Sequence, residues 1–321
     1  MARFTTPLAV IGITAALCGF PLPSMAQQNY PDKPIHVLLG FLPGTSSDIL
    51  SRYYTKKLQE VSKQTVVLEN KPGMLGLLPG GTVARAKPDG YTIWFTPSIP
   101  QARYLLKEVP FDPDKDFISV APLFETPSML SVSAKSSIKS VAELVAHLKK
   151  RPGRYGYGAP TTVVASEYFL SQTGAKAEGV GYRGASQALP EVESMTLDFI
   201  INDAMTAWPL SKAGRLRALA VTTNKRLSVA PDVPTMEEAG VPDYHFAGWW
   251  GAFVPAGTPP EVVAKLAALF AEINNMPETK AFLETAVAAP VLEDANWMRT
   301  QLVKDTETWG RLVKLTNLQP Q

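Results

Sequence analysis

Residues 35–52 read IHVLLGFLPGTSSDILSR and carry the pattern that sets the fold class. An apolar run over 35–41 predicts a buried strand, the loop PGTSSD follows it, and residues 46–61 have the spacing of an amphipathic helix. Similar runs predict further strands at 65–68, 91–95, 129–132, 197–201, 216–222 and 251–254. Several of these runs are apolar throughout, which is typical of parallel strands covered on both faces.

Helix starts lie between the predicted strands. Capping-box spacings, in which a hydroxyl residue and a glutamate three positions later satisfy main-chain donors, occur at Ser140 with Glu143, Thr235 with Glu238, and Thr258 with Glu261. Strand, helix and strand in succession imply right-handed crossovers. Because 321 residues exceed the usual size of one domain, we expect an α/β fold with two mostly parallel sheets.

The N-terminal residues indicate where the protein works. Arg3 precedes a short apolar run over residues 8–17, and small residues flank Met25, which predicts an export signal over residues 1–26. The only cysteine, Cys18, lies within this segment, so we expect no disulfide and no thiol nucleophile in the exported chain. The 31 Lys and Arg residues nearly balance 29 Asp and Glu residues, which favours neither nucleic acid nor an anionic membrane as a partner.

The loop after the first strand is the first candidate binding site. Its glycine and small hydroxyl residues allow a ligand to approach closely, and free N–H groups at the positive end of a helix dipole favour a carboxylate. The candidate residues are Phe41, Gly44, Thr45, Ser46, Ser47 and Asp48. The alternative is that Ser46 or Ser47 only caps the helix, since hydroxyl residues are the ordinary caps.

Residues 156–162, GYGAPTT, repeat this pattern before a second helix that is predicted over 163–172. The candidate residues are Gly158, Ala159, Pro160, Thr161, Thr162 and Val163. The fragment begins like a dinucleotide-binding fingerprint but lacks the third glycine, so no nucleotide cofactor is expected. Helix capping by Thr161 or Thr162 is again the alternative.

Further candidates for ligand binding follow other strands. Arg183 lies in a third strand-to-helix loop, and a guanidinium is a good partner for an acidic ligand. Asn202 and Asp203 end another predicted strand and can accept hydrogen bonds from a ligand or from neighbouring loops. Arg103 follows the strand over 91–95 and is a candidate partner for a second carboxylate.

The three histidines, His36, His147 and His245, are widely separated, and no pair has metal-ligand spacing. No metal site is therefore predicted. No serine lies in a G-x-S-x-G motif, so no catalytic residue is predicted either. An exported hydrolase that uses Ser46 or Ser47 stays as an alternative. It would require a histidine within hydrogen-bond reach of that serine.

Motifs along residues 30–320 resemble one family, the Bug-type periplasmic solute-binding proteins of tripartite tricarboxylate transporters. In chain order the motifs are 30–35 (YPDKPI), 41–48 (FLPGTSSD), 69–73 (ENKPG), 87–92 (KPDGYT), 111–117 (FDPDKDF), 212–222 (KAGRLRALAVT) and 231–235 (PDVPT). Each motif alone is modest, but their order over this length is highly specific.

The resemblance implies a two-lobed, type II-like periplasmic-binding-protein fold that closes on its ligand like a flytrap. It assigns residues 27–124 and 226–321 to one lobe and residues 125–225 to the other. The two crossings are expected near 123–127 and 222–225.

The resemblance also implies how a ligand is held. The family grips a carboxylate with main-chain N–H groups and ordered waters from two facing loops, which match residues 41–48 and 158–163. Arg183 and Gly184 match its basic residue and glycine, and Asn202 matches its usual aspartate.

Departures from the family pattern bear on the choice of ligand. Val163 stands where a histidine is common, Thr45 replaces a glycine, residues 77–79 replace Asn-x-Gly, and a two-residue shortening introduces Arg103. These changes remove polar atoms and add apolar surface around the cleft. We therefore expect an aromatic or larger dicarboxylate such as terephthalate, with Arg103 or Arg183 at its second carboxylate.

Together these observations predict a monomeric periplasmic receptor that needs no cofactor and delivers a small organic acid to the permease subunits of a tripartite tricarboxylate transporter. Another di- or tricarboxylate, or an aromatic monoacid, is the alternative ligand. A sensory role, in which the closed form meets a signalling receptor, would show as loss of induction rather than loss of uptake when the gene is deleted.

Overall fold

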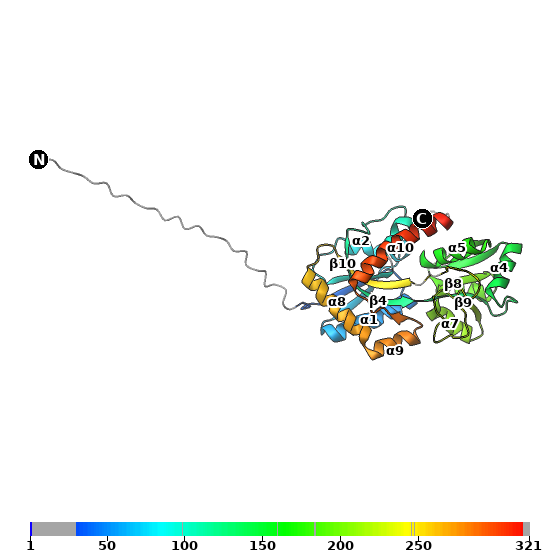
Figure 1. Ribbon diagram of the computed structural model, residues 1–321. Helices are drawn as coiled ribbons and strands as arrows, with labels where there is room; N and C mark the ends of the chain where they lie inside the picture. Colours follow the sequence, from blue (N-terminus) through cyan, green and yellow to red (C-terminus); the bar gives the residue numbers. More distant parts are fainter. Residues whose placement is uncertain are drawn as a thin grey trace. The chain divides into compact units, whose positions relative to one another are not determined.

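The computed structural model describes residue 1 and residues 30–97, 99–158, 160–182, 184–244, 246 and 248–316. The chain divides into two units, residues 1–30 and 31–321, and every helix and strand of the described residues lies in the second unit (Figure 1). The expected export signal over residues 1–26 lies outside the described residues, except for Met1.

Two sheets organise the second unit, and the parts built on them are called lobe I and lobe II here. The lobe I sheet has the strand order β11-β4-β10-β3-β1-β2, and the lobe II sheet has the order β7-β6-β8-β5-β9. The lobe I strands are β1 (Ile35–Leu39), β2 (Val66–Asn70), β3 (Thr92–Pro97), β4 (Phe117–Thr126), β10 (Gly248–Pro255) and β11 (Ala289–Pro290). The lobe II strands are β5 (Ser128–Ser133), β6 (Gly153–Tyr157), β7 (Ala177–Gly181), β8 (Phe199–Asp203) and β9 (Leu216–Val221).

Both sheets are mixed, so the expectation of mostly parallel sheets is wrong in this respect. In lobe I, β1 is parallel to β2 and β3, whereas β4 and β10 pair antiparallel with their neighbours. In lobe II, β6 is parallel to β7 and β8, whereas β5 is antiparallel to β8 and β9. Every antiparallel pair involves β4, β5 or β10, the strands beside the passages between the lobes. Strands β5 and β10 are entered from the neighbouring lobe, and β4 leads out to it. No strand–helix–strand crossover within one lobe imposes a parallel arrangement on β5 or β10.

Helices connect and cover the strands. In lobe I they are α1 (Ser46–Ser62), α2 (Leu78–Val83), α3 (Ala102–Leu105), α8 (Pro260–Asn275), α9 (Pro277–Thr285) and α10 (Ala295–Thr316), with short 3-10 turns η1 (Met74–Gly76) and η2 (Ile99–Gln101). In lobe II they are α4 (Val141–Lys150), α5 (Pro160–Thr173), α6 (Ala185–Glu193) and α7 (Ala204–Lys212). The last helix, α10, packs on β4 in lobe I and on α5 in lobe II, so it joins the two (Figure 1).

Each sheet buries an aromatic core. In lobe I, Trp94 is fully buried, and its ring lies edge-on to Phe111 with the centroids 5.6 Å apart. In lobe II, Tyr155 stacks on Phe199 with the centroids 5.5 Å apart. Inner strands such as β3 and β5 are buried along almost their whole length, whereas the edge strands β2 and β7 have exposed positions.

The predicted helix starts have different outcomes. The Ser140 hydroxyl accepts from the Glu143 N–H at 3.2 Å and caps α4, as predicted. Thr235 and Glu238 form the reciprocal bonds of a capping box at 2.9 and 3.1 Å, but a turn and not a helix follows. The box predicted at Thr258 is wrong, because Pro259 is the N-cap residue and the Thr258 hydroxyl donates to the Pro255 carbonyl instead.

The chain passes from lobe I to lobe II at Pro127, between β4 and β5. After β9 it does not return at once. Met236 and Val221 pair through the main chain, the Tyr244 hydroxyl donates to the Ala165 carbonyl, and the Phe246 N–H donates to the Thr222 carbonyl. We propose on this basis that lobe II extends to about residue 246, beyond the expected boundary at residue 225.

Candidate functional site

The carboxyl end of β1 leads through a short loop into α1, and the helix start is exposed to a cavity. The Thr45 hydroxyl accepts a hydrogen bond from the Asp48 N–H at 3.4 Å and donates one to the Leu42 carbonyl at 2.8 Å. The first N–H groups of a helix have no partner within it, and the described residues offer none to the N–H groups of Ser46 and Ser47. Both residues line the cavity, so these donors and the helix dipole can act on an anion there.

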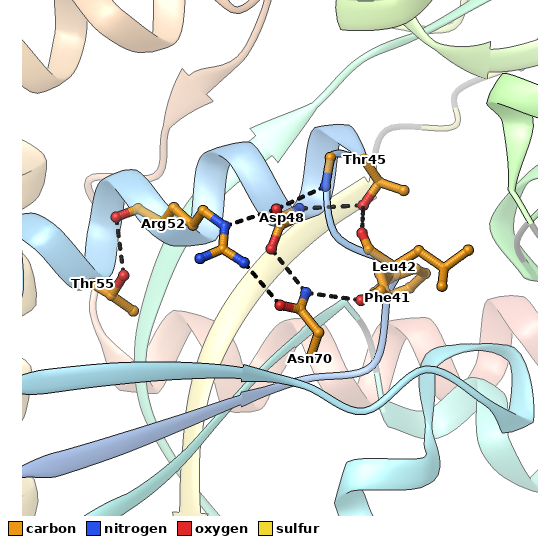
Figure 2. A network of polar contacts seen from close by, with 8 residues as sticks. Phe41, Leu42, Thr45, Asp48, Arg52, Thr55 and Asn70 are labelled. Atoms are coloured by element: carbon orange, nitrogen blue, oxygen red, sulfur yellow. Dashed lines mark hydrogen bonds and ion pairs between the residues drawn. The ribbon is translucent and has the colours of Figure 1, made fainter.

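Asp48 holds this loop in place through its hydrogen bonds with Arg52 and Asn70 (Figure 2). It does not line the cavity. Its carboxylate accepts hydrogen bonds from the Gly44 N–H and from Arg52 Nε, both at 2.9 Å, and from the Asn70 amide at 2.8 Å. The same amide donates to the Phe41 carbonyl at 2.9 Å. Burial alone would raise the pKa of Asp48, but the hydrogen bonds from Arg52, Gly44 and Asn70 outweigh burial and lower that pKa. Asp48 therefore stays charged and positions the loop.

The loop after β6 supplies a second helix start to the same cavity. Helix α5 begins at Pro160, a residue that has no N–H and suits a first helical position. The Thr162 hydroxyl accepts from the Gly158 N–H at 3.2 Å, and Gly158, Thr161 and Thr162 line the cavity. Val163 is buried in the lobe II core and does not line it. The candidate residue Ala159 lies outside the described residues.

Asp203 and Asn202, at the end of β8, have different environments. Asp203 lines the cavity, and its carboxylate accepts a hydrogen bond of 2.5 Å from the Ser46 hydroxyl across the lobes. Burial raises the pKa of Asp203, and the bond from Ser46 opposes this rise only in part. The Asn202 amide donates to the Thr206 hydroxyl at 2.7 Å, while its own carbonyl oxygen is buried without a partner. Asn202 thus does not line the cavity, whereas Asp203 does.

The cavity itself has a volume of about 500 Å³ and lies between the lobes. Its described lining residues are Gly40, Phe41, Leu42, Gly44, Thr45, Ser46, Ser47, Pro72, Gly73, Leu75, Gly76, Pro97, Thr126, Ser128, Gly158, Thr161, Thr162, Tyr182, Gly184, Asp203, Thr206, Phe246, Gly248 and Trp250. Helix starts and hydroxyl groups form its polar part. We call the starts of α1 and α5, with Ser46, Ser47, Thr161 and Thr162, the anion cradle.

Apolar side chains form the rest of the lining. Phe41 and Trp250 lie with their ring centroids 5.4 Å apart, and Leu75 and Phe246 also face the cavity. Trp250 is held in turn by stacking on Phe124 at 5.5 Å. The cavity therefore places an apolar wall beside the anion cradle.

The two arginines predicted for a second carboxylate are not both available to the cavity. Arg103, on α3, forms an ion pair of 2.6 Å with Asp114 and does not line the cavity. Arg183 lies outside the described residues, although its neighbours Tyr182 and Gly184 line the cavity. Of the described lining residues, only Asp203 carries a charge.

A second cavity, of about 860 Å³, is larger but lacks the anion cradle. Its lining includes charged residues of both signs, among them Glu125, Lys280 and Glu284, and only Thr161 from the cradle. This larger cavity is not the better candidate for an anion site. Its positive and negative lining residues offset each other, and only one residue from a helix start lines it.

Several lining residues are absent from the sequence prediction. Thr126 and Ser128 flank the passage at Pro127, and Leu75 and Trp250 form the apolar wall. The signal for them was weak, since apolar and aromatic residues more often belong to a core than to a binding site. Only their common exposure to one cavity distinguishes them.

The described histidines do not lie beside a candidate serine. His147 pairs with Asp198 at 3.2 Å, and His36 lies on β1 at the end opposite the loop. The Ser46 hydroxyl donates its hydrogen bond to Asp203 instead, and His245 lies outside the described residues.

Within the described part of the chain, no group of three side chains could hold a metal ion. No helix among the same residues is long and apolar enough to cross a membrane.

Comparison with known proteins points in the same direction as this geometry. Protein BugT of Bordetella pertussis is 28% identical over 324 residues, which cover 98% of each chain. The structure of Rpa4515 of R. palustris with adipate covers 91% of this chain and 100% of its own, with a TM-score of 0.86 and 28% identity. The structure of MatC from Rhodopseudomonas palustris with bound malate covers 88% of this chain and 100% of its own, with a TM-score of 0.81 and 25% identity.

A family profile covers most of the chain. The profile described as the tripartite tricarboxylate transporter family receptor matches residues 50–318, which include α1 from its second turn, both sheets except β1, and the second half of the anion cradle. The two-lobed fold expected from the sequence is confirmed by structures that align over nine-tenths of this chain. The chain therefore belongs to the receptor family of the tripartite tricarboxylate transporters.

Proposed function

We propose that this protein is a periplasmic receptor that binds an organic acid between its lobes and delivers it to the permease of a tripartite tricarboxylate transporter. The observation that carries the proposal is the anion cradle, because helix starts from both lobes face one cavity. Binding there would favour a closed form, which the permease would recognise. The expected export signal supports the location, and the chain would act as a monomer without a cofactor.

The carboxylate of the ligand would lie on the N–H groups of Ser46 and Ser47. Such charge-assisted hydrogen bonds are shorter and stronger than neutral ones. The start of α5 with Thr161 and Thr162 would approach from the opposite lobe. One carboxylate would in this way touch both lobes, which links its binding to closure.

The body of the ligand would lie against Phe41, Leu75 and Trp250. An aromatic ring suits this wall, since flat apolar surfaces stack on aromatic side chains. For an aromatic dicarboxylate such as terephthalate, the second carboxylate would reach the hydroxyl groups of Thr126 and Ser128, which line the same cavity. Arg183 stays the candidate cation. Adipate and malate, named with two similar structures, are also dicarboxylates, which supports this class.

A thermal-shift series with titration calorimetry tests the proposal. Terephthalate, benzoate, adipate, malate and citrate would be compared with terephthalamide, the neutral analogue of the first acid. A receptor of this kind should be stabilised in proportion to the logarithm of ligand concentration above the dissociation constant, by about 2.7 kcal/mol at a hundred times that constant. Terephthalamide should have no effect, because the cradle recognises charge.

Mass spectrometry of small acids released on denaturation would identify a ligand that copurifies. Stabilisation by amino acids alone, or equally by terephthalamide, would contradict the proposal. Stabilisation by adipate or malate with none by terephthalate would keep the receptor role and reject the aromatic ligand.

A further inference from the structure

A short turn beside the cavity has an unusual backbone. In η1, Met74 and Leu75 have φ angles of 48° and 57°, in the left-handed region that side chains other than glycine rarely adopt. The turn is closed by hydrogen bonds from the Gly76 N–H to the Gly73 carbonyl at 2.9 Å and from the Leu77 N–H to the Met74 carbonyl at 3.0 Å. Glycine at position 75 would adopt this conformation without strain.

The turn packs directly against the loop between β1 and α1. A Cβ atom on Gly40 would lie 1.8 Å from the Gly76 carbonyl oxygen, and a Cβ atom on Gly76 would lie 2.5 Å from the Phe41 ring. The two backbones therefore touch with no side chain between them. This contact sets the position of Leu75 relative to the cradle residue Ser46, which follows the same loop.

The side chain of Leu75 is used at the site. It lines the cavity, is half-buried, and packs against both the lobe I cluster around Trp94 and the cluster built mostly from lobe II residues. Strained residues persist where the surrounding structure holds them, and they gather at ligand sites. A branched apolar side chain in a glycine-like conformation, directed into the cavity, therefore points to a role in ligand choice.

We propose that Leu75 is a specificity-determining residue that selects organic acids with a long apolar body over short polar ones. The inference rests on the proposed function. With Phe41 and Trp250, Leu75 gives an apolar surface to the part of the ligand beyond the cradle. A short acid such as malate would leave its hydroxyl group beside this surface without a hydrogen-bond partner, which weakens its binding.

Two variants test the proposal, Leu75→Gly and Leu75→Ala. Both remove most of the apolar side chain, but only glycine also relieves the backbone. For each variant, titration calorimetry would give dissociation constants for terephthalate, adipate and malate. The constants for terephthalate and adipate should rise on the order of tenfold, because apolar contact is lost. The constant for malate should change less than about twofold.

Thermal unfolding without ligand provides a second readout. At ordinary positions alanine is more stable than glycine, but at a left-handed position the order is reversed. Leu75→Gly should therefore unfold at a higher temperature than Leu75→Ala, by roughly 2 °C. Equal loss of selectivity in both variants would show that the binding effect does not come from unfolding.

Met195 offers a matched control. It is also an apolar residue in the left-handed region, with φ of 64°, but it is 55% exposed and lines neither cavity. Met195→Gly should also unfold at a higher temperature than Met195→Ala. Neither Met195 variant should change any of the three dissociation constants.

The outcomes separate the inference from the proposed function. If the wild-type protein binds these acids and the Leu75 variants keep its ratio of dissociation constants, the inference is overturned and the receptor function stands. If the wild-type protein binds none of these three acids and neither benzoate nor citrate, both are overturned.

Discussion

The Ser46 hydroxyl donates a hydrogen bond of 2.5 Å to the Asp203 carboxylate and so joins the first turn of α1 in lobe I to the end of β8 in lobe II. Asp203 is the only charged residue among the described residues that line the cavity. A ligand carboxylate on the anion cradle would lie close to this second acid. Two carboxylates in a partly buried site repel each other unless one holds a proton, so ligand binding and protonation of Asp203 should be coupled.

We expect ligand affinity to rise as the pH falls. Burial raises the pKa of Asp203, so the residue is neutral below that raised value and can donate a hydrogen bond to the ligand. As the pH rises through that pKa, the new charge opposes the ligand. Tyr182 also lines the cavity, but burial raises the pKa of its hydroxyl, which stays neutral throughout. Calorimetry with terephthalate in two buffers of different ionisation enthalpy should show proton uptake on binding.

Asp203→Asn is the matched variant for this pH dependence. It keeps an acceptor for the Ser46 hydroxyl but cannot ionise, so its dissociation constant should be nearly independent of pH. A wild-type dissociation constant that does not change with pH, or the same slope in the variant, would reject the coupling. Without ligand, protonated Asp203 contributes to the stability of the folded protein at low pH. This contribution is lost as the pH rises through the raised pKa of Asp203.

Ser46→Pro should weaken ligand binding by removing one cradle donor. Ser46 is the first residue of α1, and Thr45 before it is extended with φ of −74° and ψ of 162°, a backbone that accepts a following proline. The helix should therefore form without the Ser46 N–H. Because a hydrogen bond to a charged group contributes about 1.5–3 kcal/mol, the dissociation constant for terephthalate should rise about tenfold or more.

Ser46→Ala separates the N–H group from the hydroxyl group. Alanine keeps the main-chain donor and loses only the bond to Asp203. Thermal unfolding would confirm that both variants fold, and calorimetry would compare their affinities. If the alanine and proline variants lose affinity equally, the main-chain donor is not what holds the ligand.

Asp48→Asn should destabilise the protein through the loop and not through direct contact with the ligand. Asparagine cannot replace the charge that accepts from Gly44 and Arg52, so the free energy of unfolding should fall by about 2 kcal/mol at neutral pH. The hydrogen bonds lower the pKa of Asp48, so this contribution is present above the ordinary carboxyl pKa. It should be lost as the pH falls through the lowered value.

Chemical denaturation at several pH values would measure this difference. Asp89→Asn serves as a control, because Asp89 pairs with Lys33 in a more exposed position and should contribute little. A difference between wild type and Asp48→Asn that grows toward acid pH would contradict the assignment.

Arg103→Ala should leave the affinity for dicarboxylates unchanged. The guanidinium is paired with Asp114 at 2.6 Å and does not line the cavity. Calorimetry with terephthalate and with benzoate would show whether the second carboxylate meets Arg103. A selective loss of terephthalate binding would mean that the arginine leaves Asp114 to meet the ligand.

The sequence predicts a helix or strand correctly where the residues of that segment alone determine its structure. The strand predicted over 35–41 is present over Ile35–Leu39, and the helix predicted from Ser46 begins there, but its N-cap is Thr45 and not Ser46 or Ser47. Strand β4 was missed, because Pro122 interrupts its apolar run and its pairing partner β10 is more than a hundred residues away. The box at Thr258 failed because two following prolines move the helix start by one residue.

The roles of single site residues depended on contacts that no local pattern contains. Asp48 and Asp203 were both candidates for ligand contact, yet Asp48 is enclosed by Arg52 and Asn70 while Asp203 faces the cavity. Arg103 was expected at the ligand and instead meets Asp114. Each outcome is set by which distant segment lies beside the side chain.

The sequence by itself determined the α/β class, the two loops that begin α1 and α5, and a family resemblance that the profile match confirms. These features depend on periodicity, turn residues and motif order. Each of these signals lies in a short segment of the chain or in the order of such segments. Only the tertiary structure decided the mixed pairing of the sheets, the meeting of Ser46 with Asp203, and the exposure of Leu75 to the cavity. The physical reason is that these depend on how segments far apart in the chain pack together, which side-chain periodicity does not encode.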